Sequence, residues 1–296
     1  MNAKKRLLIA FAHPDDESFG LGGLIAKYVA EGVEVSYLCA TNGDVGTVSE
    51  ELLAGYNSIA ELRIAELDCA AEKLGFKHVI KLGYKDSGMM HSETSQHPGS
   101  LWHTWGRRPD EVTRKVVETI RELKPHVVIT FNRYGGYGHP DHIAIQQATT
   151  EAFTLAADPD YITGNLPAYT PQKLYYTSIP AYMVRMGIWR ARLKGQDPRR
   201  MGRNNDIDMV RIIENVEPAH VKIDIKDYLD AWEEASACHV SQGGGSGGWL
   251  PKWLGRMLRA QQGLTRVSPV PGHTHIDEHD LFDGVTVERE TTSQPA

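Results

Sequence analysis

The chain has 296 residues, a length that suits one large α/β domain or a domain with a C-terminal elaboration. Hydrophobic residues make up 41% of it and charged residues 24%, and its net charge of −6 argues against a nucleic-acid-binding protein, which needs a basic face. No segment approaches the roughly 18 apolar residues of a membrane span. The apolar run after the basic N-terminus is too short for a signal peptide, so we expect a cytoplasmic protein.

The three cysteines, Cys39, Cys69 and Cys238, are far apart and form no CxxC pair. This spacing predicts neither a disulfide framework nor a cysteine-rich zinc module. We expect Cys39 and Cys69, which lie in apolar stretches, to be small core residues. A reducing compartment fits this cysteine usage.

The first half of the chain alternates between strand-like and helix-like segments. Strands are predicted at Leu7–Ala12, Val33–Ala40, His78–Leu82 and His126–Phe131, and helices at Leu21–Ala30, Ser58–Leu74, Pro109–Leu123 and Asp141–Ala156. This alternation predicts a Rossmann-like, mostly parallel sheet with helices on both faces. In such sheets ligands bind outside the carboxyl ends of the strands.

The second half is less regular. It contains a predicted strand at Lys173–Thr177, a basic segment at Arg185–Arg203 that fits a solvated helix and loop, and a helix at Tyr228–His239. We divide the chain into an α/β catalytic core at residues 1–180 and an extension at 181–296 that packs on the core and helps to shape the pocket. Both belong to one structural domain with a flexible tail. The glycine-rich run Gly243–Gly248 fits either a mobile lid or a surface loop.

A glycine-rich run, Gly20-Leu21-Gly22-Gly23, raises the alternative of a nucleotide-binding Rossmann domain. The run lacks the full GxGxxG pattern, and the acidic turn before it is hostile to phosphate. We therefore expect these glycines to permit close packing of a helix on the sheet.

Two motifs of metal-ligand type follow predicted strands. His13-Pro14-Asp15-Asp16 comes after the first strand, and His139-Pro140-Asp141-His142 comes after the fourth. A catalytic zinc site needs three protein ligands and one open position. We predict that His13, Asp16 and His142 are the ligands, because a turn at Pro14 can bring the first two together and His142 follows a neighbouring strand.

The remaining polar residues of the two motifs are then free for proton chemistry. Asp15 can take a proton from a metal-activated water, whose pKa falls from about 15.7 to roughly 7. His139 is a candidate for stabilising the oxyanion or protonating the leaving group. Asp141 could accept a hydrogen bond from an imidazole and fix its tautomer.

The two motifs together resemble those of the LmbE-like, or PIG-L, family of zinc-dependent N-deacetylases, and the run Gly135–His142 is most similar to the mycothiol-pathway branch. Further similarities are Arg63 and Glu66, Asp86-Ser87-Gly88, and the late segment His239-Val240-Ser241-Gln242. The resemblance implies a Zn²⁺ held by His13, Asp16 and His142, with Asp15 as general base. It also implies that His139 acts as acid or electrostatic stabiliser, with Asp141 supporting it. Tyr137 would donate a hydrogen bond to the oxyanion. Arg63 and Asp86 would hold sugar hydroxyls.

The function that these features favour is removal of acetyl from an N-acetylated amino sugar by a zinc hydrolase, with Fe²⁺ or Co²⁺ as possible substitutes for zinc. The alternatives are an amidase that acts on a thiol conjugate or another N-acyl compound, and a binding protein that has kept only the fold. Residues 90–106 have no clear counterpart in the mycothiol enzymes, and the second half matches them only loosely. We expect these two regions to define the substrate. A homo-oligomer is compatible with the sequence.

Overall fold

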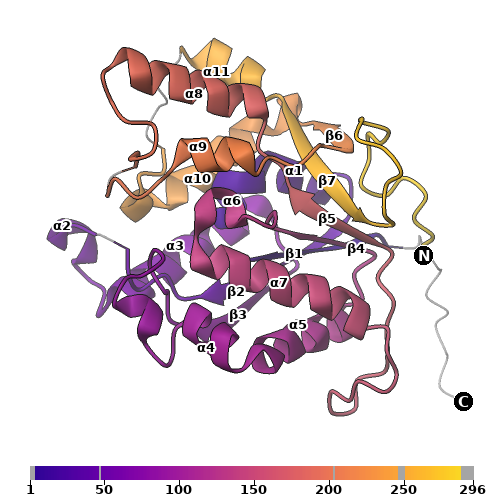
Figure 1. The fold of residues 1–296 in the computed structure, drawn as a ribbon. Coiled ribbons are helices and arrows are strands. Elements are labelled where there is room, and N and C mark those ends of the chain that lie inside the picture. Colours follow the sequence, from indigo (N-terminus) through magenta and orange to yellow (C-terminus); the bar gives the residue numbers. More distant parts are fainter. Residues whose placement is uncertain (1–3, 47, 203, 246–250, 288–296) are drawn as a thin grey trace, which may run out of the picture.

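A computed structural model describes residues 4–46, 48–202, 204–245 and 251–287. Its centre is a seven-stranded sheet with the strand order β3-β2-β1-β4-β5-β7-β6 (Figure 1). The strands are β1 (Arg6–Phe11), β2 (Glu34–Thr41), β3 (His78–Tyr84), β4 (Val127–Thr130), β5 (Lys173–Thr177), β6 (Val221–Asp224) and β7 (Gln261–Ser268).

The first five strands are parallel, as the alternation of strands and helices predicts. β7 runs antiparallel to both β5 and β6. The sheet is therefore mostly parallel with an antiparallel edge, which confirms the predicted fold class. The strand β5 was predicted with these bounds, whereas β6 and β7 were not predicted. β7 (QQGLTRVS) carries no clean alternation of apolar and polar residues.

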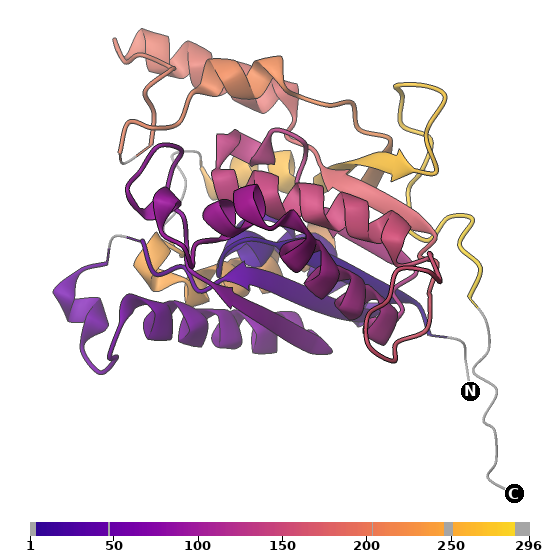
Figure 2. The ribbon, with the colours of Figure 1, turned by 60° about the horizontal axis from the view of Figure 1, so that its bottom comes forward.

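Helices cover both faces of the sheet (Figure 2). α1 (Asp16–Ala30), α3 (Ile59–Leu74) and α10 (Leu229–Cys238) pack against one another on one face, and α4 (Leu101–Arg107), α5 (Pro109–Leu123) and α7 (Pro140–Leu155) do so on the other. The shorter elements are α2 (Glu50–Leu53), α6 (Gly135–Gly138), η1 (Thr94–Gln96), η2 (Lys226–Tyr228) and η3 (Val240–Gln242). The remaining helices are α8 (Ala181–Leu193), α9 (Met209–Glu214) and α11 (Lys252–Arg259).

The helix α3 shows why local signals locate the ends of a helix to within one residue. The Ser58 side chain accepts a hydrogen bond from the Glu61 backbone N–H, and Gly75 ends the helix at a φ of 75°. A hydroxyl at the first position and a glycine in the left-handed region are the preferred caps.

The glycines of α1 do not form a phosphate-binding loop, because they lie within the helix. A Cβ on Gly22 would overlap the indole of Trp232 in α10, and one on Gly23 would lie 2.6 Å from Ile225, at the end of β6. The predicted close packing therefore exists. Here α1 packs closely mainly against another helix, α10, and not against the face of the sheet.

The prediction for the cysteines is wrong in part. Cys69 in α3 and Cys238 at the end of α10 form a disulfide bond, while Cys39 is a buried free thiol, as expected. Cys69 lies on the exposed side of α3. The two cysteines are 169 residues apart, and no spacing pattern in the chain marks such a pair.

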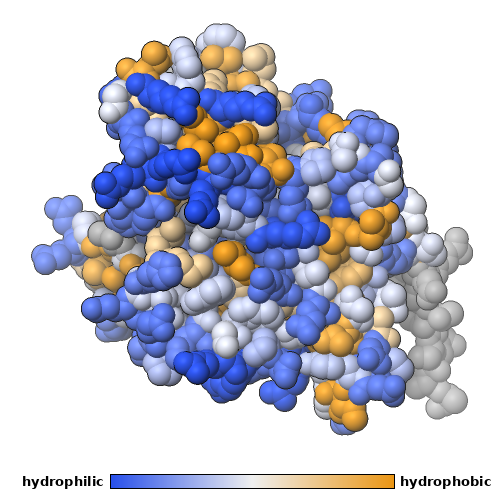
Figure 3. All heavy atoms as spheres, viewed as in Figure 1, coloured by the Kyte–Doolittle hydropathy of each residue, from blue (hydrophilic) through white to orange (hydrophobic). Residues whose placement is uncertain are grey.

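The second half of the chain contributes to the same hydrophobic core as the first. Buried residues of β6 and α10, such as Val221, Ile223 and Trp232, join the cluster formed by β1, β2 and β4. α8 forms the predicted basic helix, and among its arginines it also exposes Tyr182, Trp189 and Leu193. Figure 3 shows apolar side chains among hydrophilic ones in this part of the surface.

No helix within the described residues is long and apolar enough to cross a membrane. Residues 246–248 of the glycine-rich run and residues 288–296 of the tail lie outside the described part of the chain.

Candidate active site

The two His/Asp motifs meet at one edge of the sheet. β1 and β4 are parallel neighbours, so their carboxyl ends lie side by side. His13 follows β1 by two residues and Asp16 begins α1, while His139 and His142 lie at the start of α7. His13, His139 and His142 are all buried. Residues about 130 positions apart thus form one cluster, as predicted from the strand order.

The three predicted ligands bring their donor atoms to one point. His13 Nδ1 lies 3.1 Å from His142 Nε2. The two oxygens of the Asp16 carboxylate face one nitrogen each, with Oδ2 3.4 Å from His13 Nδ1 and Oδ1 3.4 Å from His142 Nε2. Ligand bonds of about 2.0–2.1 Å in a tetrahedral zinc site place neighbouring ligand atoms roughly 3.3–3.4 Å apart. The spacing of the three donors therefore fits a small divalent cation.

The tautomer of His142 also suits a metal ligand. Its Nδ1 lies 3.1 Å from the carbonyl oxygen of Gly135 and donates its proton there, which leaves the Nε2 lone pair directed at the cluster. Burial lowers the pKa of His142 to about 4, so the ring is neutral at physiological pH. A neutral imidazole held by a backbone carbonyl is the usual arrangement of a metal-binding histidine.

His13 is oriented in the same way by a carboxylate. Its Nε2 lies 3.2 Å from Asp141 Oδ2, and the Asp141 carboxylate accepts two further hydrogen bonds, from the backbone N–H and the hydroxyl of Ser87. Asp141 was expected to support His139. Its carboxylate instead holds His13, and only its backbone N–H reaches His139. The sequence could not distinguish the two imidazoles, because both are within reach of one side chain at the start of α7.

The cluster carries excess negative charge. Burial alone would lower the pKa of His13, but Asp86, Asp141 and Asp16 raise it well above its usual value. The Asp86 carboxylate lies 3.5 Å from His13 Nε2 and accepts the Gly88 backbone N–H, so Asp86 is bound into the site and also lines the pocket. Such a field favours a bound cation.

Other combinations of the same side chains also form potential metal-binding groups. His13, Asp86, His139 and Asp141 offer ligand atoms within 4.8 Å of one another, as do the three histidines. His139 Nδ1, however, already accepts the Asp141 backbone N–H. In the set of His13, Asp16 and His142, the contacts between nitrogen and oxygen ligand atoms are 3.1–3.4 Å long, and Asp86 and His139 remain to face the pocket.

Asp15 is held in an uncommon backbone conformation, with a φ of 138° and a ψ of −25°. Such a residue is strained by about 1–3 kcal/mol and persists only when its surroundings fix it. Its side chain lies 3.1 Å from the Arg63 guanidinium, which also donates to the Pro14 carbonyl. Burial raises the pKa of Asp15 to about 7, although the charge of Arg63 opposes this shift.

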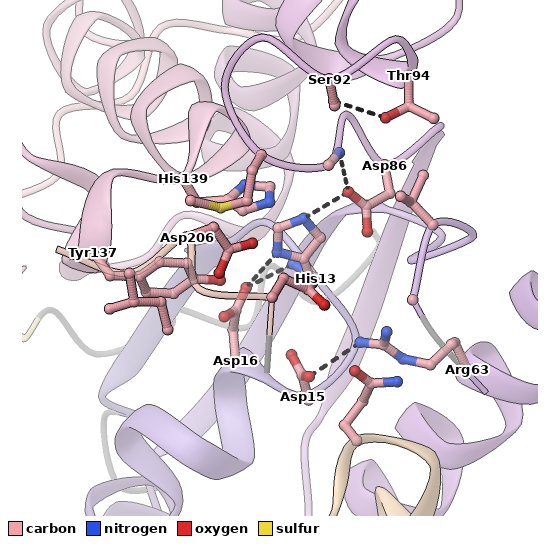
Figure 4. Close-up of a pocket in the computed structure, with 17 residues that line it drawn as sticks. His13, Asp15, Asp16, Arg63, Asp86, Ser92, Thr94, Tyr137, His139 and Asp206 are labelled. Atoms are coloured by element: carbon pink, nitrogen blue, oxygen red, sulfur yellow. Dashed lines mark hydrogen bonds and ion pairs between the residues drawn. The ribbon is translucent and has the colours of Figure 1, made fainter. Parts of the chain in front are cut away.

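His139 and Tyr137 lie on the other side of His13 from Asp15 and Arg63 (Figure 4). Because His139 Nδ1 accepts a backbone N–H, its neutral ring carries the proton on Nε2. Burial and the two neighbouring histidines lower the pKa of His139 well below its usual value. Burial raises the pKa of the Tyr137 phenol, so it stays protonated. Both side chains are therefore hydrogen-bond donors that line the pocket.

The cluster forms one wall of a pocket of about 480 Å³. Further lining residues come from segments outside the two motifs: Val45, Gly46, Met89, Ser92, Thr94, Asn204, Asp206, Ile207 and Gln242. Ser92 and Thr94 belong to residues 90–106, the segment without a clear counterpart in the mycothiol enzymes. Sequence reasoning missed Asn204 and Asp206, because an isolated polar residue in a loop gives no signal of what it faces.

The comparison with known proteins agrees with this site. The family model "PIG-L: GlcNAc-PI de-N-acetylase" matches residues 8–153, which include both motifs. The chain is 34% identical over 293 residues to a 1D-myo-inositol 2-acetamido-2-deoxy-alpha-D-glucopyranoside deacetylase of Streptomyces griseus, covering 95% of this chain and 89% of that one. It is 32% identical to the deacetylase of the same name from Rhodococcus jostii, and the match covers 96% of this chain and 99% of that one.

Solved structures share the fold at lower identity. N,N'-diacetylchitobiose deacetylase from Pyrococcus horikoshii superposes with a TM-score of 0.60 at 22% identity, covering 93% of this chain and 87% of that one. GalB, the 4-carboxy-2-hydroxymuconate hydratase from Pseudomonas putida, superposes with a TM-score of 0.58 at 17% identity, covering 91% and 98%. A hydratase and a deacetylase thus have similar folds, so the reaction has to be argued from the site.

Proposed function

Since the chain belongs to the PIG-L family of GlcNAc-PI de-N-acetylases, we propose that it is a zinc-dependent deacetylase that hydrolyses the acetamide of an N-acetylglucosamine-type glycoside. The relatives with high coverage are named for a glycoside that joins this sugar to myo-inositol, which makes such a glycoside the first substrate to test. The observation that carries the proposal is the cluster of His13, Asp16 and His142 beside a further carboxylate, Asp15, that is not one of the proposed ligands.

The proposed ligands of the zinc ion are His13 Nδ1, His142 Nε2 and the Asp16 carboxylate. When bound there, a zinc ion supplies a Lewis acid for the acetamide carbonyl and lowers the pKa of a water to near 7. Fe²⁺ or Co²⁺ can substitute at a site of two histidines and one carboxylate. Asp141 fixes the orientation of His13 from behind.

Asp15 is the proposed general base. Its pKa of about 7 places it in the range where a carboxylate both accepts a proton from the attacking water and passes it on to the leaving amine. The ion pair with Arg63 holds the carboxylate at the pocket wall. A base of this kind contributes roughly 100- to 10,000-fold to the rate.

His139 and Tyr137 are the proposed donors to the oxyanion that develops on the acetamide carbonyl. The lowered pKa of His139 favours hydrogen-bond donation from its neutral Nε2–H over transfer of a full proton. The Tyr137 hydroxyl faces the same pocket. Donors fixed in advance in a buried site are worth more than donors in water.

The rest of the pocket is proposed to bind the sugar and its aglycone. Arg63 and Asp86 lie near the cluster, where they can hold hydroxyls of the sugar. Asn204, Asp206 and Gln242 provide further polar groups from the extension at residues 181–296, which we propose to be part of one structural domain with the core. Polar groups of this kind suit a polyol better than an apolar aglycone.

The proposal is tested with purified protein loaded with zinc and incubated with the N-acetylglucosaminyl glycoside of myo-inositol. Released acetate and new primary amine are measured together. We expect equal amounts of both, and we expect Asp15→Asn to release neither above background. Absence of acetate from the wild-type protein with zinc bound would overturn the proposal.

A panel of substrates separates this function from the amidase alternative. The panel contains N-acetylglucosamine, its inositol glycoside, and N-acyl thiol conjugates with larger acyl groups. Preference for acetyl on the glycoside supports the deacetylase. Preference for the larger acyl conjugates would identify an amidase with the same catalytic group.

A further inference from the structure

The segment that comes after α10 contacts both helices that carry the partners of Asp15. His239 has no exposed surface, and its Nε2 lies 2.6 Å from the Glu17 carboxylate in the first turn of α1. Two residues further on, the Ser241 backbone N–H and hydroxyl donate to Glu66 of α3, at 2.7 and 2.6 Å. Arg63, which pairs with Asp15, lies one turn before Glu66 on the same helix.

Glu17 connects His239 to the backbone of Asp15. One oxygen of its buried carboxylate accepts from His239 and from the Ser18 hydroxyl, and the other accepts the Asp15 backbone N–H at 3.1 Å. That N–H belongs to the residue whose φ is 138°. The hydrogen bond that Asp15 donates to Glu17 is therefore one of the contacts that hold the strained peptide in place.

His239 uses only one of its two ring nitrogens for this contact. Its Nδ1 is buried without a hydrogen-bond partner among the described residues. Burial alone would lower the pKa of His239, but its hydrogen bond and ion pair with Glu17 raise it above the usual value. His239 therefore acts on Glu17 through its Nε2–H, which pairs with a carboxylate that has no access to water.

We propose that His239 is a positioning residue for the reaction, and that it acts through Glu17 to hold Asp15 in its strained conformation. This inference rests on the proposed role of Asp15 as base. Without a donor at Nε2, the Glu17 carboxylate loses its orientation, and the Asp15 peptide relaxes toward an ordinary conformation. The Asp15 carboxylate then moves out of line with the attacking water, while the sugar still binds.

Two conservative substitutions test this directly. The amide nitrogen of glutamine reaches about the position of the imidazole Nε2, whereas that of asparagine reaches only the position of Nδ1, which has no partner among the described residues. We expect His239→Gln to keep most of kcat and His239→Asn to lower kcat by about 10- to 100-fold, the usual loss when a group supporting a catalytic residue is removed. KM and zinc content should stay within about twofold of wild type.

Equal kcat for wild type and His239→Asn would overturn the inference, and so would an equal loss in both variants. Ser236→Ala is a matched control, because Ser236 lies in the last turn of α10, just before His239, and donates to the Ser18 carbonyl. It should leave kcat unchanged. Thermal melting of each variant shows whether it is folded.

A double-mutant cycle tests the route through Glu17 and gives a second way to refute it. If His239 acts through Glu17, the variant with both His239→Asn and Glu17→Gln should lose no more activity than the worse single variant. If the loss of activity in the double variant equals the product of the losses in the two single variants, His239 does not act through Glu17. An inactive wild-type protein would refute the proposed function, whereas an active wild type with an unaffected His239→Asn variant refutes only this inference.

Discussion

Reduction of the Cys69–Cys238 disulfide is expected to lower the stability of the protein strongly. The bond joins residues 169 positions apart, so it closes a large loop in the unfolded chain. The chain-entropy relation gives a loss of about 17 cal/mol/K for such a loop, which corresponds to about 5 kcal/mol at 25 °C. This value is an upper limit, because measured disulfides usually contribute about 2–4 kcal/mol.

Urea unfolding of the oxidised and reduced protein measures the effect. With an m-value of about 3 kcal/mol/M, a loss of 3–5 kcal/mol moves the midpoint by roughly 1–1.7 M. The variant with both Cys69→Ser and Cys238→Ser should unfold at the midpoint of the reduced protein and should not respond to reductant. Cys39→Ala is the control, because Cys39 is a free thiol and its variant should keep the full response.

Counting thiols tests the bond itself. Protein purified without reductant and then unfolded should show one reactive thiol, and reduced protein should show three. Three thiols in the unreduced protein would refute the reasoning, as would an identical unfolding midpoint with and without reductant.

The site and the packing around it lead to three further predictions. Asp15→Asn should lower the rate of deacetylation by at least about 100-fold while the protein still binds one zinc ion, measured by metal analysis, and an active variant would exclude Asp15 as the base. His142→Ala should bind no zinc after dialysis. A chelator that lowers the melting temperature of the wild type should therefore leave the melting temperature of this variant unchanged. An equal effect of the chelator on both proteins would exclude His142 as a ligand. Gly22→Ala should destabilise the protein by about 1–3 kcal/mol in urea unfolding, because the new methyl group overlaps Trp232. Gly20→Ala, whose methyl group would meet only Phe11 at 3.9 Å, is its control, and equal stability of the two variants would contradict the close packing.

The parallel half of the sheet and the meeting of the two motifs could be predicted from the sequence. Strands such as Leu7–Ala12 are continuous apolar runs, and parallel strands bring the residues beyond their carboxyl ends to one edge of the sheet. This is why His13 and His142 could be paired across about 130 residues without coordinates.

Contacts between the two halves of the chain could not be predicted, because they depend on how α10 and β7 return to the core. The Cys69–Cys238 bond and the pair of Glu17 with His239 join positions more than 160 residues apart, and neither side of either pair carries a pattern that identifies its partner. The orientation of Asp141 was out of reach for another reason. The Asp141 carboxylate contacts His13 and not His139 because of how the two neighbouring imidazole rings are oriented, and residue spacing does not encode these orientations.

The lining of the pocket combines two parts of the chain with different tasks. The side chains proposed to touch the reacting groups all lie between residues 13 and 142, whereas Asn204, Asp206 and Gln242 in the pocket lining come from a region after residue 200. Chimeras can exploit this separation. Exchanging residues 204–207 with those of a relative alters the surface that we propose to meet the aglycone and leaves every proposed metal ligand in place. The reaction and the choice of substrate can therefore evolve at different rates in such a protein, or be engineered one at a time.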